Sequence, residues 1–585
     1  MRYVSIIIFC LAFSQSSFGT IYYVSLSGNN ANDGSSSRPW RTIQYAATKV
    51  PANQGHTIKI AAGTFVENQI HVPQGVHVLG EGRNVTIIKS NSSFYYYPAS
   101  PGFTNDKFLI RFYSGSSVAG NQSIKNLTID GDGKKLHGGI FIHNRNNVTV
   151  ENVRIQYVNF SGLWFSSSNN STAKNIVLKD CAWGSSSWCS AALQFAHSTN
   201  LDISGFDIDE GRGYGIKNLG HDQNQPLTNV KLHHGKVSVH QVGLWNGGSA
   251  PNIAIEFWAS GFSGTEIYNT YVDNHISIIN PNNTQSGTPL KIYNNVFDIL
   301  GLRTKGSGYC MELSSSSVEV RNNWFNGGYT GIVNWSAKVF TNWNIHHNVF
   351  YGISGGPNPT AVVTSYKGGL QNLNLYNNTV EMTQTGQAVH FLEFDNSSRG
   401  TNINVKNNLI INGAQAANRV INLRHGGSVS GLNVTNNFFQ NITQGTAPGN
   451  YSGNISGTSN IVRSGNKPQG FYNHTAGGNL IDKGAFVGYE SKPDIGACGD
   501  NNVIGTAASS SPPAPTPSPT PVAVSSVTIS PATVSVGING KATLTKAITP
   551  SNATNQGVTW TSGNPNIPKV DANGIVTGVA VGSTT

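Results

Sequence analysis

Six copies of one short pattern decide the fold of this chain: LKIYNNVF at Leu290, VEVRNNWF at Val318, WNIHHNVF at Trp343, LNLYNNTV at Leu373, INVKNNLI at Ile403 and LNVTNNFF at Leu432. Successive copies are about 25 to 30 residues apart, a period typical of solenoids. Alternating apolar residues within a copy, such as Leu373 and Leu375, predict a strand with one inward face. Each copy therefore predicts one β-coil.

The second asparagine of the pattern recurs at one position of the coil. These residues are Asn295, Asn323, Asn348, Asn378, Asn408 and Asn437. Inside a turn, an asparagine amide can bond its own backbone and the stacked copies above and below it. We therefore expect a ladder of stacked asparagines, which also accounts for the many sequon-like strings without invoking glycosylation.

The first residues have the features of an export signal. Arg2 supplies a positive charge, an apolar run extends from Ile6 to Phe13, and the small residues Ser17 and Gly19 precede Thr20. No later apolar run approaches the roughly 18 to 20 residues that span a bilayer. The sequence therefore predicts a secreted or surface-exposed bacterial protein with a signal peptide at residues 1–19 and no transmembrane anchor.

Charge and cysteine content narrow the expected partners. Charged residues are 11% of the chain, against about 25% in ordinary proteins, yet the net charge is +10. This balance favours an acidic glycan over nucleic acid as the partner of an exported protein, although a basic surface unrelated to the substrate remains an alternative. Cys181 and Cys189 are close enough to staple a local loop, and no CxxC pair predicts zinc. We expect a monomer.

The segments at both ends of the long repeat region add a family resemblance. YYVSLSGNNANDGSSSRPWRTIQYAA begins at Tyr22, AGTFVENQIHVPQGVHVLGEGRNVTII follows, and NLIDKGAF with KPDIGA comes near residue 490. With the repeats, they resemble the pectin-lyase-like, right-handed parallel β-helix superfamily over residues 21–500. The resemblance implies an all-β solenoid whose first coil is capped by a short helix from Thr42 to Val50. It does not fix a reaction, because the superfamily contains hydrolases, lyases, epimerases and adhesins.

The composition changes after Gly505. SSSPPAPTPSPTP predicts an extended linker, and the segment from Val527 onward resembles the bacterial immunoglobulin-like domain of group 2. Its last strand is not reached at Thr585, so we expect an incomplete β-sandwich and a chain that is a fragment. The predicted domains are 1–19 signal peptide, 20–506 β-helix, 507–524 linker and 525–585 immunoglobulin-like domain.

Candidate site residues come from aligning the strand that precedes each repeat, because equivalent positions on successive coils stack about 4.8 Å apart. The outward column is expected to be Phe141, Trp164, Gln194, Lys217, Glu256, Ser277, Glu312, Val333, Val363, His390 and Asn422. Trp258, Ser314 and Trp335 lie two positions further along. Exposed indoles beside polar groups are typical of a glycan cleft. We therefore predict substrate-binding roles for Trp164, Gln194, Trp258, His275, Ser277, Trp335 and His390.

Three residues of the column suggest catalysis. Lys217 lies one coil from Glu256 and favours its ionised form, so Glu256 is the candidate base. Glu312, two coils beyond Glu256 and beside Val333, is the candidate acid. Two strand spacings of about 9.6 Å match inverting glycosidases, at about 6.5 to 9.5 Å, better than retaining ones. The first hypothesis is therefore a secreted inverting glycoside hydrolase that cleaves an extended polysaccharide and needs no cofactor.

Two other functions remain open. A polysaccharide lyase could use Lys217 or His390 as its base, with calcium held by Glu256 and Glu312. LRHG from Leu423 resembles a string in alginate and chondroitin lyases, but FLEFDNSS replaces the lysine motif expected one coil earlier, so no role is transferred. A non-catalytic adhesin would be favoured by a column covered by loops, and Lys217 with Glu256 would then be only a cross-strand ion pair.

Other polar groups are expected to be structural. Asp130 and Asp132 resemble the opening of a calcium loop, yet Phe141 stands where the closing glutamate would be. The acids after Phe206 are predicted to lie on a solvated coil edge. The histidine pairs that begin at His233 and His346 fall at predicted turns, where metal binding is not expected.

Overall fold

In the computed structural model the chain divides into two compact units, Met1–Pro512 and Pro513–Thr585. The structure describes residues 19–91, 107–133, 136–182, 190–211, 213–218, 225–240, 253–283, 288–299, 308–354, 361–382, 388–413, 418–445, 447–459, 461–463, 472–474, 525–551, 558, 560–571 and 573–584. The predicted signal peptide up to residue 18, the linker 507–524 and the NLIDKGAF and KPDIGA segments lie outside these residues. Among the described residues, no helix is long and apolar enough to cross a bilayer.

The first unit begins with strand β1 (Ile21–Val24) and one short helix, α1 (Ile43–Lys49). The Thr42 hydroxyl caps the helix by accepting a bond from the N–H of Tyr45, and the buried Glu67 carboxylate accepts from the N–H groups of Ile43 and Gln44 at 2.7 and 3.0 Å. The sequence prediction of a helix between Thr42 and Val50 is confirmed.

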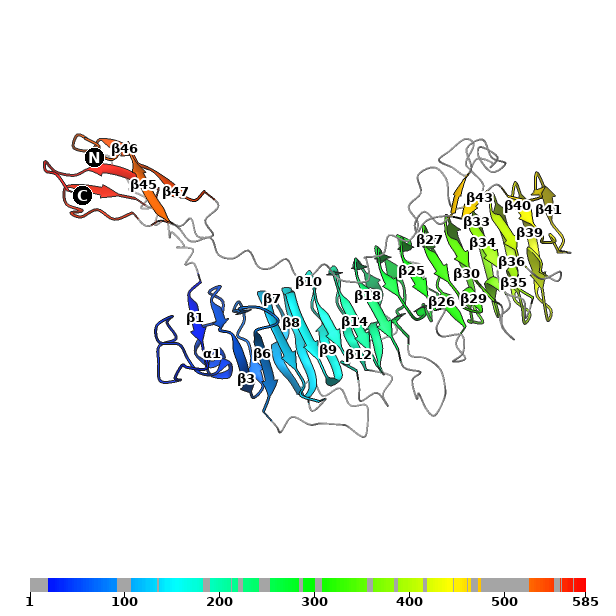
Figure 1. Cartoon of the computed structure of the whole chain (residues 1–585), viewed down its shortest axis with the longest axis horizontal. Helices are drawn as coiled ribbons and strands as arrows, with labels where there is room; N and C mark the ends of the chain where they lie inside the picture. Colours follow the sequence, from blue (N-terminus) through cyan, green and yellow to red (C-terminus); the bar gives the residue numbers. More distant parts are fainter. Residues whose placement is uncertain are drawn as a thin grey trace, which may run out of the picture. The chain divides into compact units, whose positions relative to one another are not determined.

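Each later coil contributes one strand to each of three parallel sheets (Figure 1). The first sheet contains β9 (Val158–Ser166), β12 (Ala191–Ala196), β15 (Tyr214–Asn218), β19 (Ile255–Trp258), β23 (Ile276–Ile279), β26 (Tyr309–Ser314), β29 (Thr330–Asn334), β32 (Ala361–Ser365), β35 (His390–Phe394) and β38 (Ile421–Leu423). The second contains β10 (Ser171–Lys174), β13 (Leu201–Ser204), β17 (Val230–His233), β21 (Glu266–Tyr268), β24 (Leu290–Tyr293), β27 (Val318–Arg321), β30 (Val339–His346), β33 (Gly369–Tyr376), β36 (Arg399–Lys406) and β39 (Ser428–Thr435). The third contains β11 (Val177–Lys179), β14 (Asp207–Glu210), β18 (Lys236–Val239), β22 (Tyr271–Val272), β25 (Val296–Asp298), β28 (Trp324–Asn326), β31 (Val349–Tyr351), β34 (Thr379–Met382), β37 (Leu409–Asn412) and β40 (Phe438–Gln440). The predicted parallel β-helix is confirmed.

The interior is filled by side chains that stack on their equivalents in neighbouring coils. Phe297, Phe325 and Phe350 are fully buried, and their ring centroids are 5.0 and 4.5 Å apart. Leu373 and Leu375, predicted to point inward, are also fully buried. Because every coil repeats the same inward positions about 4.8 Å apart, the core is a set of continuous columns.

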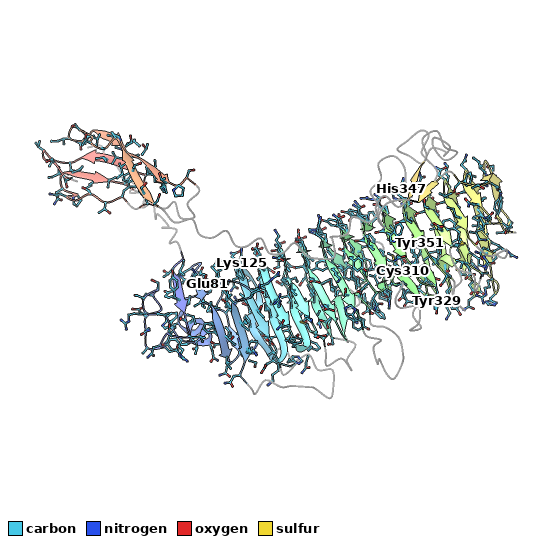
Figure 2. The ribbon with its side chains drawn as sticks, in the orientation of Figure 1. Glu81, Lys125, Cys310, Tyr329, His347 and Tyr351 are labelled. Atoms are coloured by element: carbon cyan, nitrogen blue, oxygen red, sulfur yellow. The ribbon has the colours of Figure 1, made fainter. Side chains whose placement is uncertain are left out.

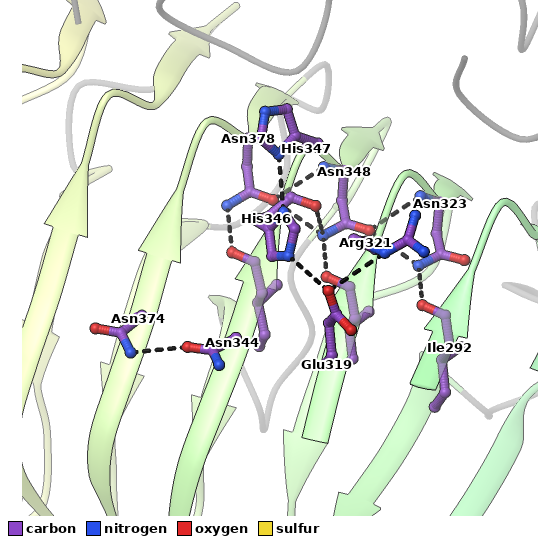
Figure 3. Close-up of polar contacts among 12 residues, drawn as sticks. Ile292, Glu319, Arg321, Asn323, Asn344, His346, His347, Asn348, Asn374 and Asn378 are labelled. Carbon is purple, nitrogen blue, oxygen red and sulfur yellow. Dashed lines mark hydrogen bonds and ion pairs between the residues drawn. The ribbon is translucent and has the colours of Figure 1, made fainter. Parts of the chain in front are cut away.

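The predicted asparagine ladder is present, and every predicted member is fully buried. In one step, Asn348 donates its backbone N–H and its side-chain NH₂ to Asn378 Oδ1, both at 3.0 Å (Figure 3). The same NH₂ also donates to the carbonyl of Val320 at 2.9 Å, on the preceding coil. The pattern repeats from Asn295 to Asn437 and continues to Asn454. Each amide therefore joins three coils and is satisfied without water.

The residue before each ladder asparagine adopts a left-handed turn conformation. Its φ is 55° at Asn322, 51° at Asn377 and 56° at Asn407. Asparagine tolerates this conformation better than most residues, which explains why the pattern carries two asparagines in succession. His347 takes the same place, with φ 54°.

His347 forms a histidine pair with His346 (Figure 3). Both side chains are buried. Their Nδ1 atoms are 2.8 Å apart, and His346 Nε2 lies 3.3 Å from Glu319 Oε1. The His346 ring stacks on Tyr376 at 4.5 Å. Burial lowers the pKa of His347 to about 3, and burial also lowers the pKa of His346. Both rings are therefore neutral at neutral pH.

The cysteine prediction is wrong for Cys181. Cys181 is a free, buried thiol, and its Sγ lies 3.1 Å from the carbonyl oxygen of Ile155 in the core. Burial raises the pKa of this thiol well above its usual value. Cys310, labelled in Figure 2, is also a reduced, buried thiol, whereas Cys189 lies outside the described residues.

The second unit consists of antiparallel strands. β45 (Ser526–Ser530) pairs with β47 (Thr545–Thr549), and β49 (Ile575–Gly578) lies between β46 (Lys541–Thr543) and β48 (Pro568–Val570). Two small antiparallel sheets are the elements of an immunoglobulin-like sandwich.

We expect Asn378→Ala to destabilise the solenoid strongly. The substitution removes the oxygen that accepts from the buried N–H and NH₂ groups of Asn348, which should cost about 3 kcal/mol. Urea unfolding measures this loss. The control is Asn374→Ala in the half-buried amide row of the second sheet, where Asn374 donates to Asn344 at 2.8 Å, and it should cost below about 1 kcal/mol. Equal costs would contradict a special role for the buried ladder.

We expect His347→Asn to reduce the acid sensitivity of folding. The folded pKa of about 3 lies below the unfolded value of about 6.5, so stability is complete above pH 6.5 and is lost as the pH falls towards 3. This contribution amounts to about 2 kcal/mol by pH 5. Asn322 and Asn377 occupy the same turn position, so the variant should fold. Urea unfolding at pH 7 and pH 5 gives the difference, and an unchanged pH dependence would show that His347 does not cause it.

Candidate functional site

The predicted outward column is continuous over most of the first sheet. Register pairs run Phe141–Trp164, Trp164–Gln194, Gln194–Lys217, Lys217–Glu256, Glu256–Ser277, Ser277–Glu312 and Glu312–Val333. Neighbouring positions in a parallel sheet are about 4.8 Å apart, so Glu256 and Glu312 are separated by about 9.6 Å of backbone.

Beyond Val333 the column differs from the prediction. Val333 pairs with Thr364, Thr364 with Glu393, and Glu393 with Asn422. Val363 belongs instead to the inward column and is fully buried in the core. The strand AVVTS is buried at every position, so apolar alternation could not fix its register.

His390 also lies off the column, because it pairs with Ala361 at the start of its strand. Its Nδ1 accepts a hydrogen bond from the backbone N–H of Arg419 at 3.2 Å. Burial, with the nearby charges of Arg419 and Arg424, lowers the pKa of His390 to about 4. His390 therefore contacts the next coil instead of standing in the predicted outward column.

Lys217 and Glu256 form an ion pair on adjacent strands, β15 and β19, in which Lys217 Nζ meets Glu256 Oε2. Each side chain is only 7% exposed. The Lys217 ammonium also lies 4.0 Å from the centroid of the Tyr214 ring. The pair is thus desolvated on both sides, and each charge depends on the other for compensation.

Glu312 has a different environment from Glu256. Ser277, between the two glutamates, donates its hydroxyl to Glu312 Oε2 at 2.7 Å. Burial raises the pKa of Glu312, the Ser277 bond lowers it, and the Glu256 charge raises it further. The net effect is upward, so Glu312 holds its proton at higher pH than an ordinary glutamate. One carboxylate is paired with a cation and the other favours its acid form.

Four predicted binding residues near these carboxylates differ in their exposure to solvent. Trp258 is 37% exposed, and the Asn218 side chain holds its backbone by accepting from its N–H and donating to its carbonyl. Trp335 is half-buried, Ser277 is fully buried, and His275 is buried. Burial lowers the pKa of His275 to about 4, so its ring is neutral near pH 7.

Trp164 and Gln194 lie in a packed part of the column. Trp164 is 6% exposed and contacts Phe141, with ring centroids 5.0 Å apart, in an outer aromatic cluster that includes Phe108. Gln194 is fully buried. The sequence shows that these side chains leave the core, but it does not show that they are covered. The open part of the face therefore begins near Trp258.

Sequence reasoning missed three tyrosines on this face. Tyr309 lies near both carboxylates. Burial, together with the charges of Glu312 and Glu256, raises its pKa. Its ring meets His275 edge-on at 4.8 Å and Trp335 at 6.2 Å. Tyr214 and Tyr309 each stand three residues before a site residue of the column, and this shared spacing was the signal available in the sequence. The third is Tyr366, which packs edge-on against Trp335 at 4.8 Å.

The described residues contain no group of three or more histidine, cysteine, aspartate or glutamate side chains placed to hold a metal ion. Asp132 forms an ion pair with Lys89, with Oδ1 and Nζ 3.1 Å apart, as expected of a turn residue. Among the acids after Phe206, Glu210 turns inward and accepts from the N–H groups of Cys181 and Ala182. Asp209 instead pairs with His240 at 2.8 Å.

The fold and this face together define a polar parallel β-helix solenoid joined to an immunoglobulin-like module. Residues 523–585 match the bacterial Ig-like domain (group 2), which confirms the resemblance of this segment. Residues 26–231 match a family described as a protein of unknown function (DUF1565). An uncharacterised protein of Clostridium acetobutylicum is 42% identical over 59 residues, which are 10% of this chain and 6% of that protein. The match thus covers a small fraction of that relative's length.

Several solved structures are similar to the chain. The complex of XylC with xylose has 10% identity and a TM-score of 0.37, with 76% of this chain and 88% of that chain covered. PfbA, a surface adhesin of Streptococcus pneumoniae, has 14% identity and a TM-score of 0.38, with coverage of 74% and 93%. The catalytic unit of an alpha-1,3-glucanase from Streptomyces thermodiastaticus has 13% identity and a TM-score of 0.35, with coverage of 72% and 70%. Similarity at this level leaves the function to be argued from the chain's own side chains.

We expect Lys217→Met to destabilise the solenoid by about 3 kcal/mol at pH 7, because it leaves a buried carboxylate without its cation. Adding Glu256→Gln should restore most of the loss. Urea unfolding measures both effects. The matched control is Lys125→Met. Lys125 (Figure 2) pairs with Glu151 at 2.7 Å, but both side chains are more than one-third exposed. Loss of this pair should therefore cost below about 1 kcal/mol. Similar costs for the two lysines would contradict the desolvated pair.

Proposed function

We propose that the first-sheet face between Lys217 and Glu312 is the catalytic site of an exported inverting glycoside hydrolase that acts on an extended polysaccharide. The observation that carries the proposal is the order Lys217, Glu256, Ser277, Glu312 on four successive coils. In this order a cation-paired carboxylate stands two coils from a carboxyl group whose pKa is raised, chiefly by burial. The spacing of about 9.6 Å leaves room for a sugar and a water between them.

In this mechanism Glu312 donates its proton to the glycosidic oxygen as the bond to the anomeric carbon breaks. Glu256 accepts a proton from a water that attacks the same carbon from the opposite face, so the anomeric configuration inverts. Lys217 positions Glu256 through their ion pair. Trp258, two residues after Glu256, and Trp335, one coil beyond Glu312, provide ring surfaces for neighbouring sugars.

The polysaccharide lyase remains the alternative enzyme. Its candidate base His390 lies off the column, and Lys217 would have to leave its ion pair with Glu256 to accept a proton. A non-catalytic, glycan-binding adhesin is the second candidate function. It is favoured by the burial of Trp164 and Gln194, which removes two predicted contacts from the surface.

We expect Glu312→Gln to reduce cleavage by on the order of 100-fold or more, because the amide keeps the bond from Ser277 but has no proton to donate. Glu256→Gln should have a similar effect on turnover but also removes the carboxylate partner of Lys217, so its activity is compared with that of Lys217→Met/Glu256→Gln. The assay incubates the full chain with a panel of acidic and neutral polysaccharides and records new reducing ends and absorbance near 235 nm.

The readouts separate the three functions. Reducing ends without new absorbance indicate hydrolysis, both together indicate a lyase, and neither indicates a binding protein. Wild-type rates in both glutamine variants would contradict the assigned catalytic pair. The polarimetric sign of the first product formed tests inversion directly.

A further inference from the structure

Beyond Glu312, each of four successive coils carries a cation in the turn that leads from the first sheet to the second or at the first residue after that turn. These cations are Lys338, Lys367, Arg399 and Arg424, and we call them the cationic rim. Three of them are exposed, and the Arg424 side chain is 29% exposed. The nearby acids Glu393, in β35, and Asp395, in the turn that follows it, are both fully buried. The charge that these turns present to solvent is therefore positive.

The turns of successive coils are hydrogen-bonded to one another, so the four cations lie along one edge of the solenoid, at different positions within their coils. The backbone N–H groups of Tyr366, Asp395 and Arg424 donate to carbonyls of the preceding coil at 2.9 to 3.0 Å. Arg399 in turn pairs with Gly369 on the coil before it. At about 4.8 Å per coil, the four cations extend over about 14 Å. Such spacing suits a polymer with repeated negative charges.

The buried Asp395 orients the far end of the rim. Its Oδ1 lies 2.7 Å from His425 Nδ1, and its Oδ2 lies 3.7 Å from Arg424 Nη1. The His425 side chain is 61% exposed, whereas the Asp395 side chain has no exposed surface. A ligand would therefore meet the nitrogen donors while the carboxylate stays behind them, an arrangement suited to carboxylate or sulfate oxygens.

Aromatic side chains join the rim to the proposed catalytic site. Tyr309, Trp335 and Tyr366 stand on three successive coils, with ring centroids 6.2 and 4.8 Å apart. Trp335 and Tyr366 are half-buried, so part of each ring faces solvent. Four coil spacings, about 19 Å, separate Glu312 from Arg424, which is a length of several sugar units.

We propose that the cationic rim, with Trp335 and Tyr366, binds the acidic groups of a polyanionic glycan whose scissile bond lies at Glu256 and Glu312. The inference rests on the proposed function for the position of the scissile bond. It adds the substrate class, a polymer that bears carboxylate or sulfate groups. Binding at the rim is independent of bond cleavage, so the two proposals can fail separately.

The experiment measures binding in the full chain with Glu312→Gln, so that no substrate is consumed. The rim variant adds Lys338→Gln, Lys367→Gln and Arg424→Gln. The control variant instead adds Lys174→Gln, Lys179→Gln and Lys231→Gln, which remove the same charge from strands of earlier coils. Polygalacturonate is compared with its methyl ester, and dextran sulfate with dextran, by affinity electrophoresis at 0.05 and 0.5 M salt.

We expect the rim variant to bind at least one acidic polymer 10-fold or more weakly, and the control variant less than 2-fold weakly. Loss for polygalacturonate identifies carboxylate recognition, and loss for dextran sulfate alone identifies sulfate recognition. Equal losses in the two variants, equal affinity for the neutral polymers, or no binding of either acidic polymer would overturn the proposal. Reducing-end assays on the chain with wild-type Glu312 show separately whether cleavage occurs.

Discussion

The closure of each coil against the next depends on the buried asparagine ladder. One amide accepts two hydrogen bonds from the coil before it and donates to that coil and the next, so a single position fixes both the turn and the stacking. The left-handed residue before it, such as Asn322, turns the chain so that this amide points inward. In the coils from Asn295 to Asn454, this constraint holds the strands of all three sheets at one stacking position.

Much of the fold could be predicted because the same strand pattern recurs in six copies along the sequence. The strand pattern, the ladder from Asn295 to Asn437 and the capping helix after Thr42 each follow from local chemistry that leaves few alternatives. The neighbourhood of Lys217, Glu256 and Glu312 could be predicted too, because in a solenoid the register carries a residue from one coil to the same place on the next.

The rest could not be read from the sequence for two physical reasons. Where both faces of a strand are apolar, as around Val363, alternation no longer fixes the register, and the neighbouring strand with His390 is displaced with it. Alternation also separates inward from outward residues without saying whether the outward ones are covered. Trp164 points away from the core and is still buried, whereas Trp258, also outward, is 37% exposed.

The ladder also has a direction, which bears on the order of assembly. The N–H and NH₂ groups of each ladder asparagine are completed by the amide oxygen of the next one, from Asn295 through Asn437 to Asn454. A finished coil therefore presents two open donors on its C-terminal edge as a template for its successor. The ladder can thus form vectorially, coil by coil, in the order in which the chain is synthesised. Each ladder asparagine bonds only within its own coil and to adjacent coils, so no coil needs a partner that is distant in the sequence.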